Sequence, residues 1–165
     1  MKKSEIKDIV NNLSREDLPL LIKISSIEGL LYSINYIERL VRSSEFYVIW
    51  REYNRVHQEA AIDAIEGINT ADYVGLNLEL HHYPYSLFEI CQIVGSQILL
   101  EKEITDPFEV ARVVLEEHLA GNIGYVPLLI TDHQKFHVDL LELEEDHIQG
   151  NYKQFIKSYG LKLRE

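Results

Sequence analysis

The sequence has little cysteine, proline or glycine. Its only cysteine among 165 residues is Cys91. One cysteine cannot close an intramolecular disulfide and cannot supply the paired thiolates of a cysteine-rich zinc finger, so any metal site must use His, Asp or Glu. Four prolines and eight glycines are too few for collagen-like repeats or for a low-complexity disordered chain.

A long hydrophobic run is also missing. The most apolar stretch, residues 18–34, is interrupted by Lys23, Glu28 and Gly29, and charged residues within a bilayer are costly. The amino terminus carries lysines but no apolar core or small-residue cleavage site, which argues against a secretory signal. We therefore expect a cytoplasmic protein that does not contact a membrane.

Cations are scarcer than anions. Sixteen Lys and Arg residues stand against 27 Asp and Glu residues, for a net charge of −11, which counts against a basic duplex-binding surface. The imbalance is uneven, because residues 1–57 have a balance of +1 and residues 58–165 one of −12. The last residues are basic again. If the protein binds phosphate, residues 1–57 and the carboxy-terminal tail should supply the cations.

The chain does contain a strong helical pattern with one interruption. Its length suits a single domain with one core. Apolar residues recur at helical spacing throughout residues 1–57. From residue 60 the period changes, and residues 60–65 and 74–83 predict two strands joined by a hairpin or short loop. The expected fold class is α+β, mostly helical with a small antiparallel β-hairpin.

Capping signals predict the later helices. Ser86 and Glu89 form a capping box that opens one helix, and Asp106 before Pro107 opens a second, which ends near a Gly-rich loop. A short apolar strand follows that loop.

A last capping box predicts the final helix. It consists of Thr131 and Gln134, and the helix is expected over residues 132–148. Gly150 and Asn151 then stop it.

Four of the seven histidines form two close pairs, His81 with His82 and His133 with His137. Neighbours on a strand point to opposite faces, so His82 should continue a buried row of leucines while His81 shares its face with Glu79. Residues four apart on a helix share one face, so His133 and His137 can bind one ion. The helix N-terminus disfavours imidazolium and keeps both rings neutral, as a metal requires.

Three stretches together, LELHHYP, GNIGYVPLL and TDHQKFH, resemble the core of the HNH, or His-Me finger, endonucleases, and the likeness is greatest to bacteriophage-encoded members. The resemblance implies a ββα-metal core. It also implies that His81, His133 and His137 bind one divalent ion, that His82 is the general base for the attacking water, and that Asn122 stabilises the loop around that base.

The resemblance further implies an activity and a domain organisation. The expected activity is metal-dependent hydrolysis of phosphodiester bonds, in DNA rather than RNA, with Mg, Mn, Ni or Zn as the ion, in the host cytoplasm. Residues 1–57 would be a helical segment packed on the core. Residues 58–150 would be the HNH-like core with a helical insertion, and residues 151–165 a basic tail.

Other functions are compatible with the same residues. The chain could be a catalytically inactive HNH-like acidic protein, an adaptor or regulator that binds a basic host or phage protein, as its charge of −12 over residues 58–165 suggests. A zinc ion could also only brace the fold. Exposed aromatic residues in the helical segment could form a homodimer interface.

Overall fold

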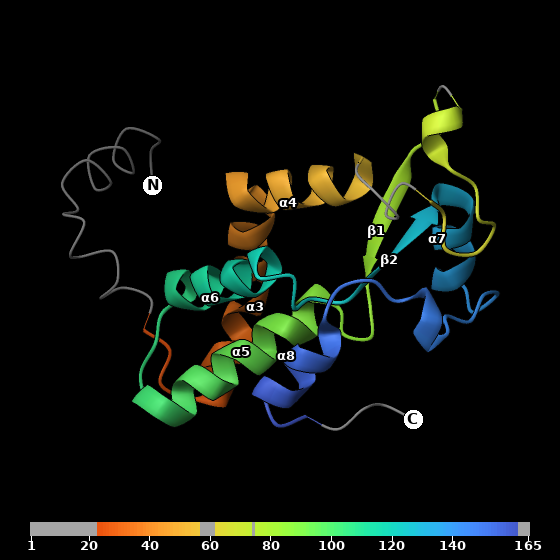
Figure 1. Ribbon diagram of the computed structural model, residues 1–165. Helices are drawn as coiled ribbons and strands as arrows, with labels where there is room; N and C mark the ends of the chain where they lie inside the picture. The colour runs from red at the N-terminus through yellow and green to blue at the C-terminus, as the bar shows by residue number, and fades with distance from the viewer. Residues whose placement is uncertain (1–22, 57–61, 74, 162–165) are drawn as a thin grey trace.

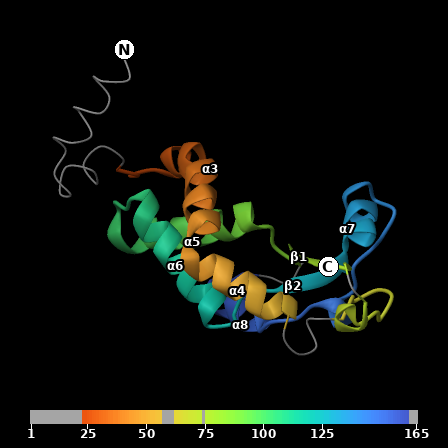
Figure 2. The same cartoon turned by 90° about the horizontal axis from the view of Figure 1, so that it is seen from above.

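The computed structural model describes residues 23–56, 62–73 and 75–161 (Figure 1). Within these ranges the chain forms six α-helices and one two-stranded antiparallel sheet. The predicted α+β class is therefore confirmed. Five helices gather on one side of the sheet and one helix lies on the other (Figures 1 and 2). The helical pattern predicted for residues 1–22 lies outside the described ranges.

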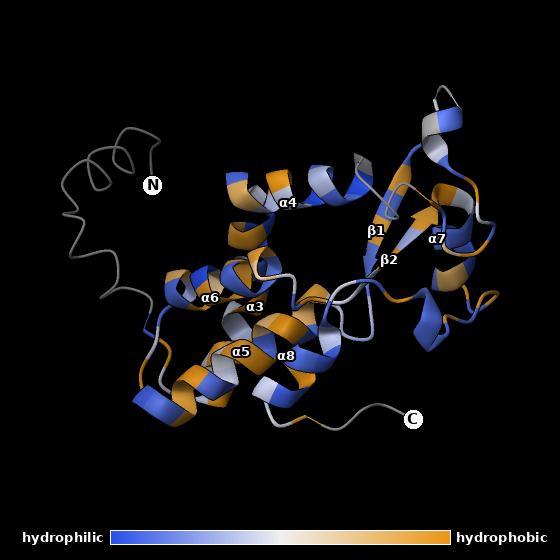
Figure 3. Cartoon of the chain, in the orientation of Figure 1, coloured by the Kyte–Doolittle hydropathy of each residue, from blue (hydrophilic) through white to orange (hydrophobic). Residues whose placement is uncertain are grey.

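The helical body is built on four helices: α3 (Ile27–Ser43), α4 (Glu45–Val56), α5 (Leu87–Lys102) and α6 (Pro107–Leu119). Helix α3 packs against both α5 and α6, and α4 contacts α6 and the sheet. Helix α5 is largely apolar (Figure 3). A Cβ atom on Gly95 of α5 would lie 2.5 Å from Leu30 Cδ1. Glycine at this position therefore allows α3 and α5 to approach closely.

The start of each of the two central helices agrees with its predicted capping signal. Ser86 Oγ accepts a hydrogen bond from the Glu89 N–H, and the Glu89 carboxylate accepts one from the Ser86 N–H. Asp106 accepts hydrogen bonds from the second and third backbone N–H groups of α6, with Pro107 in the first turn. Both predictions are confirmed because caps depend on neighbouring residues only.

The sheet pairs two segments that are distant in sequence. Strand β1 (Leu78–His82) runs antiparallel to β2 (Tyr125–Leu129), with Leu80 opposite Pro127. The predicted hairpin between residues 60–65 and 74–83 is therefore wrong for the described residues. Residues 57–61 lie outside the described part of the chain. The reason for the wrong prediction is Asp63, whose carboxylate accepts hydrogen bonds from backbone N–H groups two and three residues later and forms a turn.

The last part of the chain differs most from the prediction. Helix α7 (Ile130–His137) ends eleven residues before the predicted end at Ile148, and Thr131 is not its N-cap. Asp139 adopts a positive φ of 57°. The Leu140 N–H donates to Lys135 O and the Asp139 N–H to Phe136 O, which terminates the helix in a Schellman arrangement. The sequence signal was missed because aspartate, not glycine, occupies the left-handed position.

A further helix, α8 (Tyr152–Ser158), lies in the segment that was predicted as a basic tail. Its residues Tyr152, Phe155 and Ile156 are buried in the main core. The tail therefore contributes apolar packing as well as charge. None of the helices in the described part of the chain combines the length and apolarity that a bilayer span needs.

Candidate metal centre

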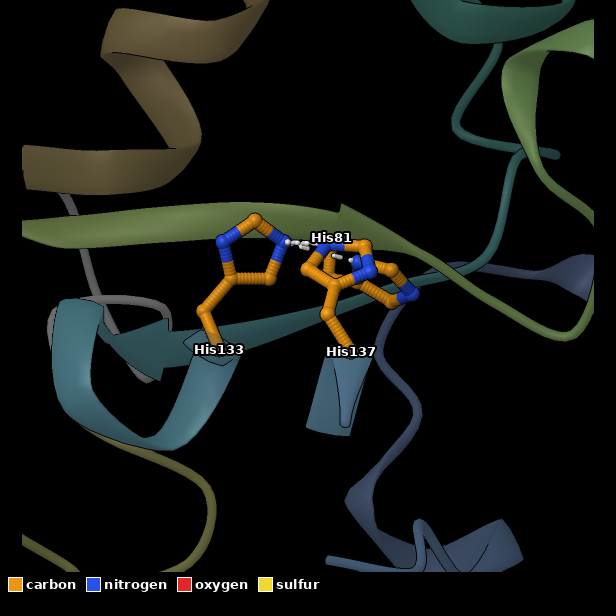
Figure 4. Close-up of side chains that lie close together, drawn as sticks. All are labelled: His81, His133 and His137. Atoms are coloured by element: carbon orange, nitrogen blue, oxygen red, sulfur yellow. Dashed lines mark hydrogen bonds between the residues drawn. The ribbon is translucent and has the colours of Figure 1, made fainter. Parts of the chain in front are cut away.

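Three of the predicted ligand residues come together at the sheet. His81 projects from β1, and His133 and His137 project from α7, which packs across both strands (Figure 4). His133 Nε2 lies 3.0 Å from His81 Nδ1 and 3.0 Å from His137 Nε2. One nitrogen from each ring lies within 4.8 Å of the other two. The two elements and the spacing of four residues on α7 produce this convergence.

These distances suit a shared ion. Imidazole nitrogens on a tetrahedral zinc ion are about 3.3 Å apart, since each Zn–N bond is about 2.05 Å. Glu79 accepts a hydrogen bond from His133 Nδ1. The proton of the neutral ring is then on Nδ1, and the lone pair of Nε2 faces the other two rings. The residues present therefore fit a divalent ion with three nitrogen ligands.

Glu79 has a second consequence for the site. It lies two residues before His81 on the same face of β1, as the strand period predicts, and its carboxylate reaches His133 from there. A carboxylate on the outer nitrogen of a metal-binding histidine orients the ring and makes the inner nitrogen a stronger ligand. This contact was not predicted, although the position of Glu79 relative to His81 was a usable signal.

The three rings differ in their surroundings. His81 and His133 are half-buried and His137 is exposed. The His81 ring packs 4.6 Å from the ring of Phe136, centroid to centroid. Burial, and to a smaller extent the neighbouring His133 and His137, lowers the pKa of His81 to about 4. His81 is therefore neutral at pH 7, in the form that a metal binds.

The structure places His82 on the opposite face of β1, in the buried row that the alternation predicted. Only 9% of its surface is exposed. Its ring stacks on Tyr47 and Trp50, and its Nε2 lies 3.0 Å from His118 Nε2. Burial holds the pKa of His82 well below its usual value, with a further contribution from His118. The predicted general base thus faces the helical body rather than the three-histidine cluster.

His118 explains the orientation of His82. Its Nδ1–H donates to Val114 O at 2.7 Å, so its Nε2 is an acceptor and the Nε2–H of His82 is the donor between the two rings. His118 is 1% exposed, and burial lowers its pKa to about 4. His118 is therefore a core residue. Its pairing with His82 was not predicted, because the two residues are 36 positions apart.

Asn122 lies between α6 and β2, before the first strand residue that pairs with β1. Its side-chain amide donates to Glu117 Oε2 at 2.7 Å, and its backbone N–H donates to Glu117 O. Asn122 therefore joins the end of α6 to the following loop. The partner observed for His82 is His118, so the predicted support of His82 by Asn122 stays a prediction.

One comparison with known proteins gives a match over nearly the whole chain. The profile of the bacteriophage G278-like virion protein family matches residues 2–165. The chain belongs to this family. No curated protein and no solved structure shows a significant match.

Membership in the virion protein family agrees with the bacteriophage origin that the sequence predicted. The family description assigns its members to the virus particle and names no enzymatic activity. The resemblance to HNH endonucleases, the bound metal and the cytoplasmic location therefore stay predictions.

Proposed function

We propose that this virion protein binds one divalent metal ion at His81, His133 and His137 and hydrolyses phosphodiester bonds of nucleic acid, DNA rather than RNA, at that site. The observation that supports the proposal most strongly is the convergence of three imidazole nitrogens, within 4.8 Å of one another, from β1 and α7. Mg, Mn, Ni and Zn are all candidates. Nitrogen ligands favour the transition metals among them.

Three protein ligands leave a coordination position open, as in catalytic rather than structural zinc sites. His137 is exposed, so this side of the cluster is accessible to a polymer. A bound divalent ion would supply Lewis-acid stabilisation of the charge that develops on phosphoryl oxygens. His81 and His133 would hold the ion from two elements, and Glu79 would orient His133.

The first experiment measures metal binding. The full-length protein is stripped of metal and titrated with Zn²⁺, Ni²⁺, Mn²⁺ and Mg²⁺ by isothermal calorimetry. We expect one ion per chain for the wild type and none for His133→Ala/His137→Ala. His147→Ala is the matched control, because His147 lies outside the cluster and pairs locally with Glu144 and Asp146. Equal binding by the double variant and the control would contradict the site.

The second experiment measures hydrolysis. Supercoiled DNA and single-stranded RNA are incubated with the protein and each metal, and nicking or shortening is followed on gels. The proposal expects metal-dependent cleavage that His133→Ala/His137→Ala abolishes and His147→Ala retains. Metal binding that raises the melting temperature, without cleavage of either substrate under any metal, would overturn the hydrolysis and assign the ion a structural role.

The adaptor function is a second candidate, favoured by one observation. Several acidic residues on the segment after α7 are exposed: Asp139, Glu142, Glu144, Glu145 and Asp146. Such a surface suits a basic partner protein through electrostatic complementarity. Binding to a purified basic virion or host protein that weakens when these residues are replaced by their amides, together with absence of cleavage, would favour this function over hydrolysis.

A further inference from the structure

A cavity of about 350 Å³ lies directly beside His133. Three arginines from the helical body line it, Arg42 of α3 and Arg51 and Arg55 of α4. The opposite wall is formed by β1 residues and by His133 itself. Figure 1 shows the end of α4 pointing toward β1, which agrees with this lining. Arginines from one end of the sequence thus share a cavity with a predicted metal ligand from the other.

The guanidinium groups are held loosely. Arg51 and Arg55 share one carboxylate, that of Glu52, at 3.4 and 2.6 Å, and half of the Arg51 side chain is exposed. Arg42 lies 3.4 Å from Glu38, also with an exposed side chain. Exposed pairs of this kind contribute only about 0–1 kcal/mol. An anionic ligand can therefore redirect these donors at small cost.

Arg55 both lines the cavity and ties α4 to the segment before β1. Its Nη1 donates to Asn77 Oδ1 at 3.4 Å. Its Nε is buried and, within the described part of the chain, donates to no acceptor. The buried Nε is out of reach of a group in the cavity, so a phosphate there would bind the Nη groups, whose planar fork matches phosphate oxygens.

We propose that this cavity is a phosphate-binding site, in which Arg51 and Arg55 hold a phosphate of a nucleic-acid backbone next to the three-histidine cluster. The proposal rests on the proposed function for the role of the neighbouring ion. Phosphate binding by the arginines does not depend on that ion. A strongly acidic protein as a whole repels an anionic ligand. At this cavity the cations come from residues 1–57, the part of the chain whose charge balance is positive, so the ligand meets local positive charge.

Two carboxylates, those of Glu52 and Glu79, also line the cavity. Glu52 neutralises one of the guanidinium charges, and Glu79 is engaged by His133. Arg42, Arg51 and Arg55 thus outnumber the two carboxylates of the lining. An ion at the histidines would add two further positive charges nearby and would strengthen binding of an anion.

The test measures binding in metal-free protein, so that no bound ion contributes to the affinity. Two probes are used. Binding of a fluorescein-labelled single-stranded oligonucleotide is measured by fluorescence anisotropy, and binding of inorganic phosphate is measured by competition and calorimetry. We expect Arg51→Gln and Arg55→Gln each to weaken oligonucleotide binding about tenfold, since each removes a charged donor to phosphate. Arg55→Lys, which keeps the charge without the fork, should recover only part of the loss.

Arg112→Gln is the matched control. It removes the same charge from another helix, where Arg112 pairs with Glu116 and both side chains are exposed. We expect this control to bind as the wild type does, and melting temperatures of all variants establish that they fold. Equal affinity of Arg51→Gln/Arg55→Gln and Arg112→Gln would overturn the site.

The two probes separate the sources of phosphate, and cleavage separates the two proposals. Arginine-dependent binding of the oligonucleotide at lower concentration than inorganic phosphate supports a nucleic-acid backbone, whereas binding of inorganic phosphate alone overturns that source and identifies a free phosphate. Arginine-dependent binding without cleavage under any metal overturns the proposed hydrolysis and supports the cavity. Metal-dependent cleavage that Arg51→Gln/Arg55→Gln leaves unchanged supports the proposed hydrolysis and overturns the phosphate-binding cavity.

Discussion

The two faces of strand β1 present neighbouring histidines to opposite environments. His81 turns toward α7, where three ring nitrogens converge at a partly exposed site. His82 turns toward the helical body, where Tyr47 and Trp50 cover its ring and His118 accepts a hydrogen bond from its Nε2–H. The same residue type thus has the geometry of a metal ligand on one face and of a buried hydrogen-bonding residue on the other. The difference comes from burial and partners.

The largest effect is expected from replacing histidines on the His81 face of β1, which we call the open face; the His82 face is the buried face. His133→Ala/His137→Ala deletes two of the three proposed ligands, and a single imidazole cannot hold the ion. We expect the affinity for Zn²⁺ or Ni²⁺ to fall at least about a thousandfold, which is about 4 kcal/mol. The free energy of urea unfolding of the metal-free protein should change little, because His137 is exposed and His133 is only half-buried. A large loss of metal-free stability would show that the open face is part of the core.

The buried face should respond in the opposite way. His82→Ala leaves a cavity among Tyr47 and Trp50 and removes the donor to His118 Nε2. We expect it to lower the free energy of unfolding by about 2–4 kcal/mol. Metal affinity, measured by calorimetry below the unfolding temperature, should stay close to that of the wild type.

His82→Gln separates packing from catalysis. Its side-chain amide can still donate to His118, so the fold should be retained. If this variant binds metal normally but has lost cleavage, His82 is the general base that the HNH resemblance implies. If it cleaves as the wild type does, His82 has a structural role only.

The buried face should also make the protein sensitive to acid. His118 has its pKa lowered from 6.5 to about 4 by burial, so below pH 6.5 the unfolded chain binds a proton that the folded chain does not. Stability is therefore full above pH 6.5 and falls as the pH decreases toward 4, by up to about 3 kcal/mol from this residue. Urea unfolding at several pH values measures the slope.

His118→Gln cannot titrate and should flatten that slope. His147→Gln, which lies outside both faces of β1, is the control variant. An unchanged pH dependence in His118→Gln would contradict the assignment. Arg42 adds to the lowering of the pKa.

The smallest expected effect concerns the support of the open face. Glu79→Gln keeps the size of the side chain but weakens the acceptor for His133 Nδ1–H. We expect the metal affinity to fall about tenfold, at the lower end of what outer-shell partners contribute. Glu142→Gln, which changes an exposed carboxylate on another segment, is the control. Equal affinities of the two variants would show that Glu79 does not orient the ligand.

Much of the fold and of the cluster could be predicted because the signals are local. The capping residues Ser86 and Asp106 determine where α5 and α6 begin through hydrogen bonds to the next few residues. Likewise the spacing of His133 and His137 places both on one helix face. The hairpin at residue 60 and the long last helix were mispredicted because local pattern is ambiguous where Asp63 forms a turn and Asp139 adopts a positive φ.

The α+β class, the helix starts and the alternation that separates His81 from His82 can be read from the residues alone, since they follow from backbone periodicity and short-range hydrogen bonds. The folded chain was needed to show that β1 pairs with β2, that His118 contacts His82, and that arginines of α4 lie beside His133. These contacts join segments dozens of residues apart, and they depend on how whole helices bury their apolar faces against one another.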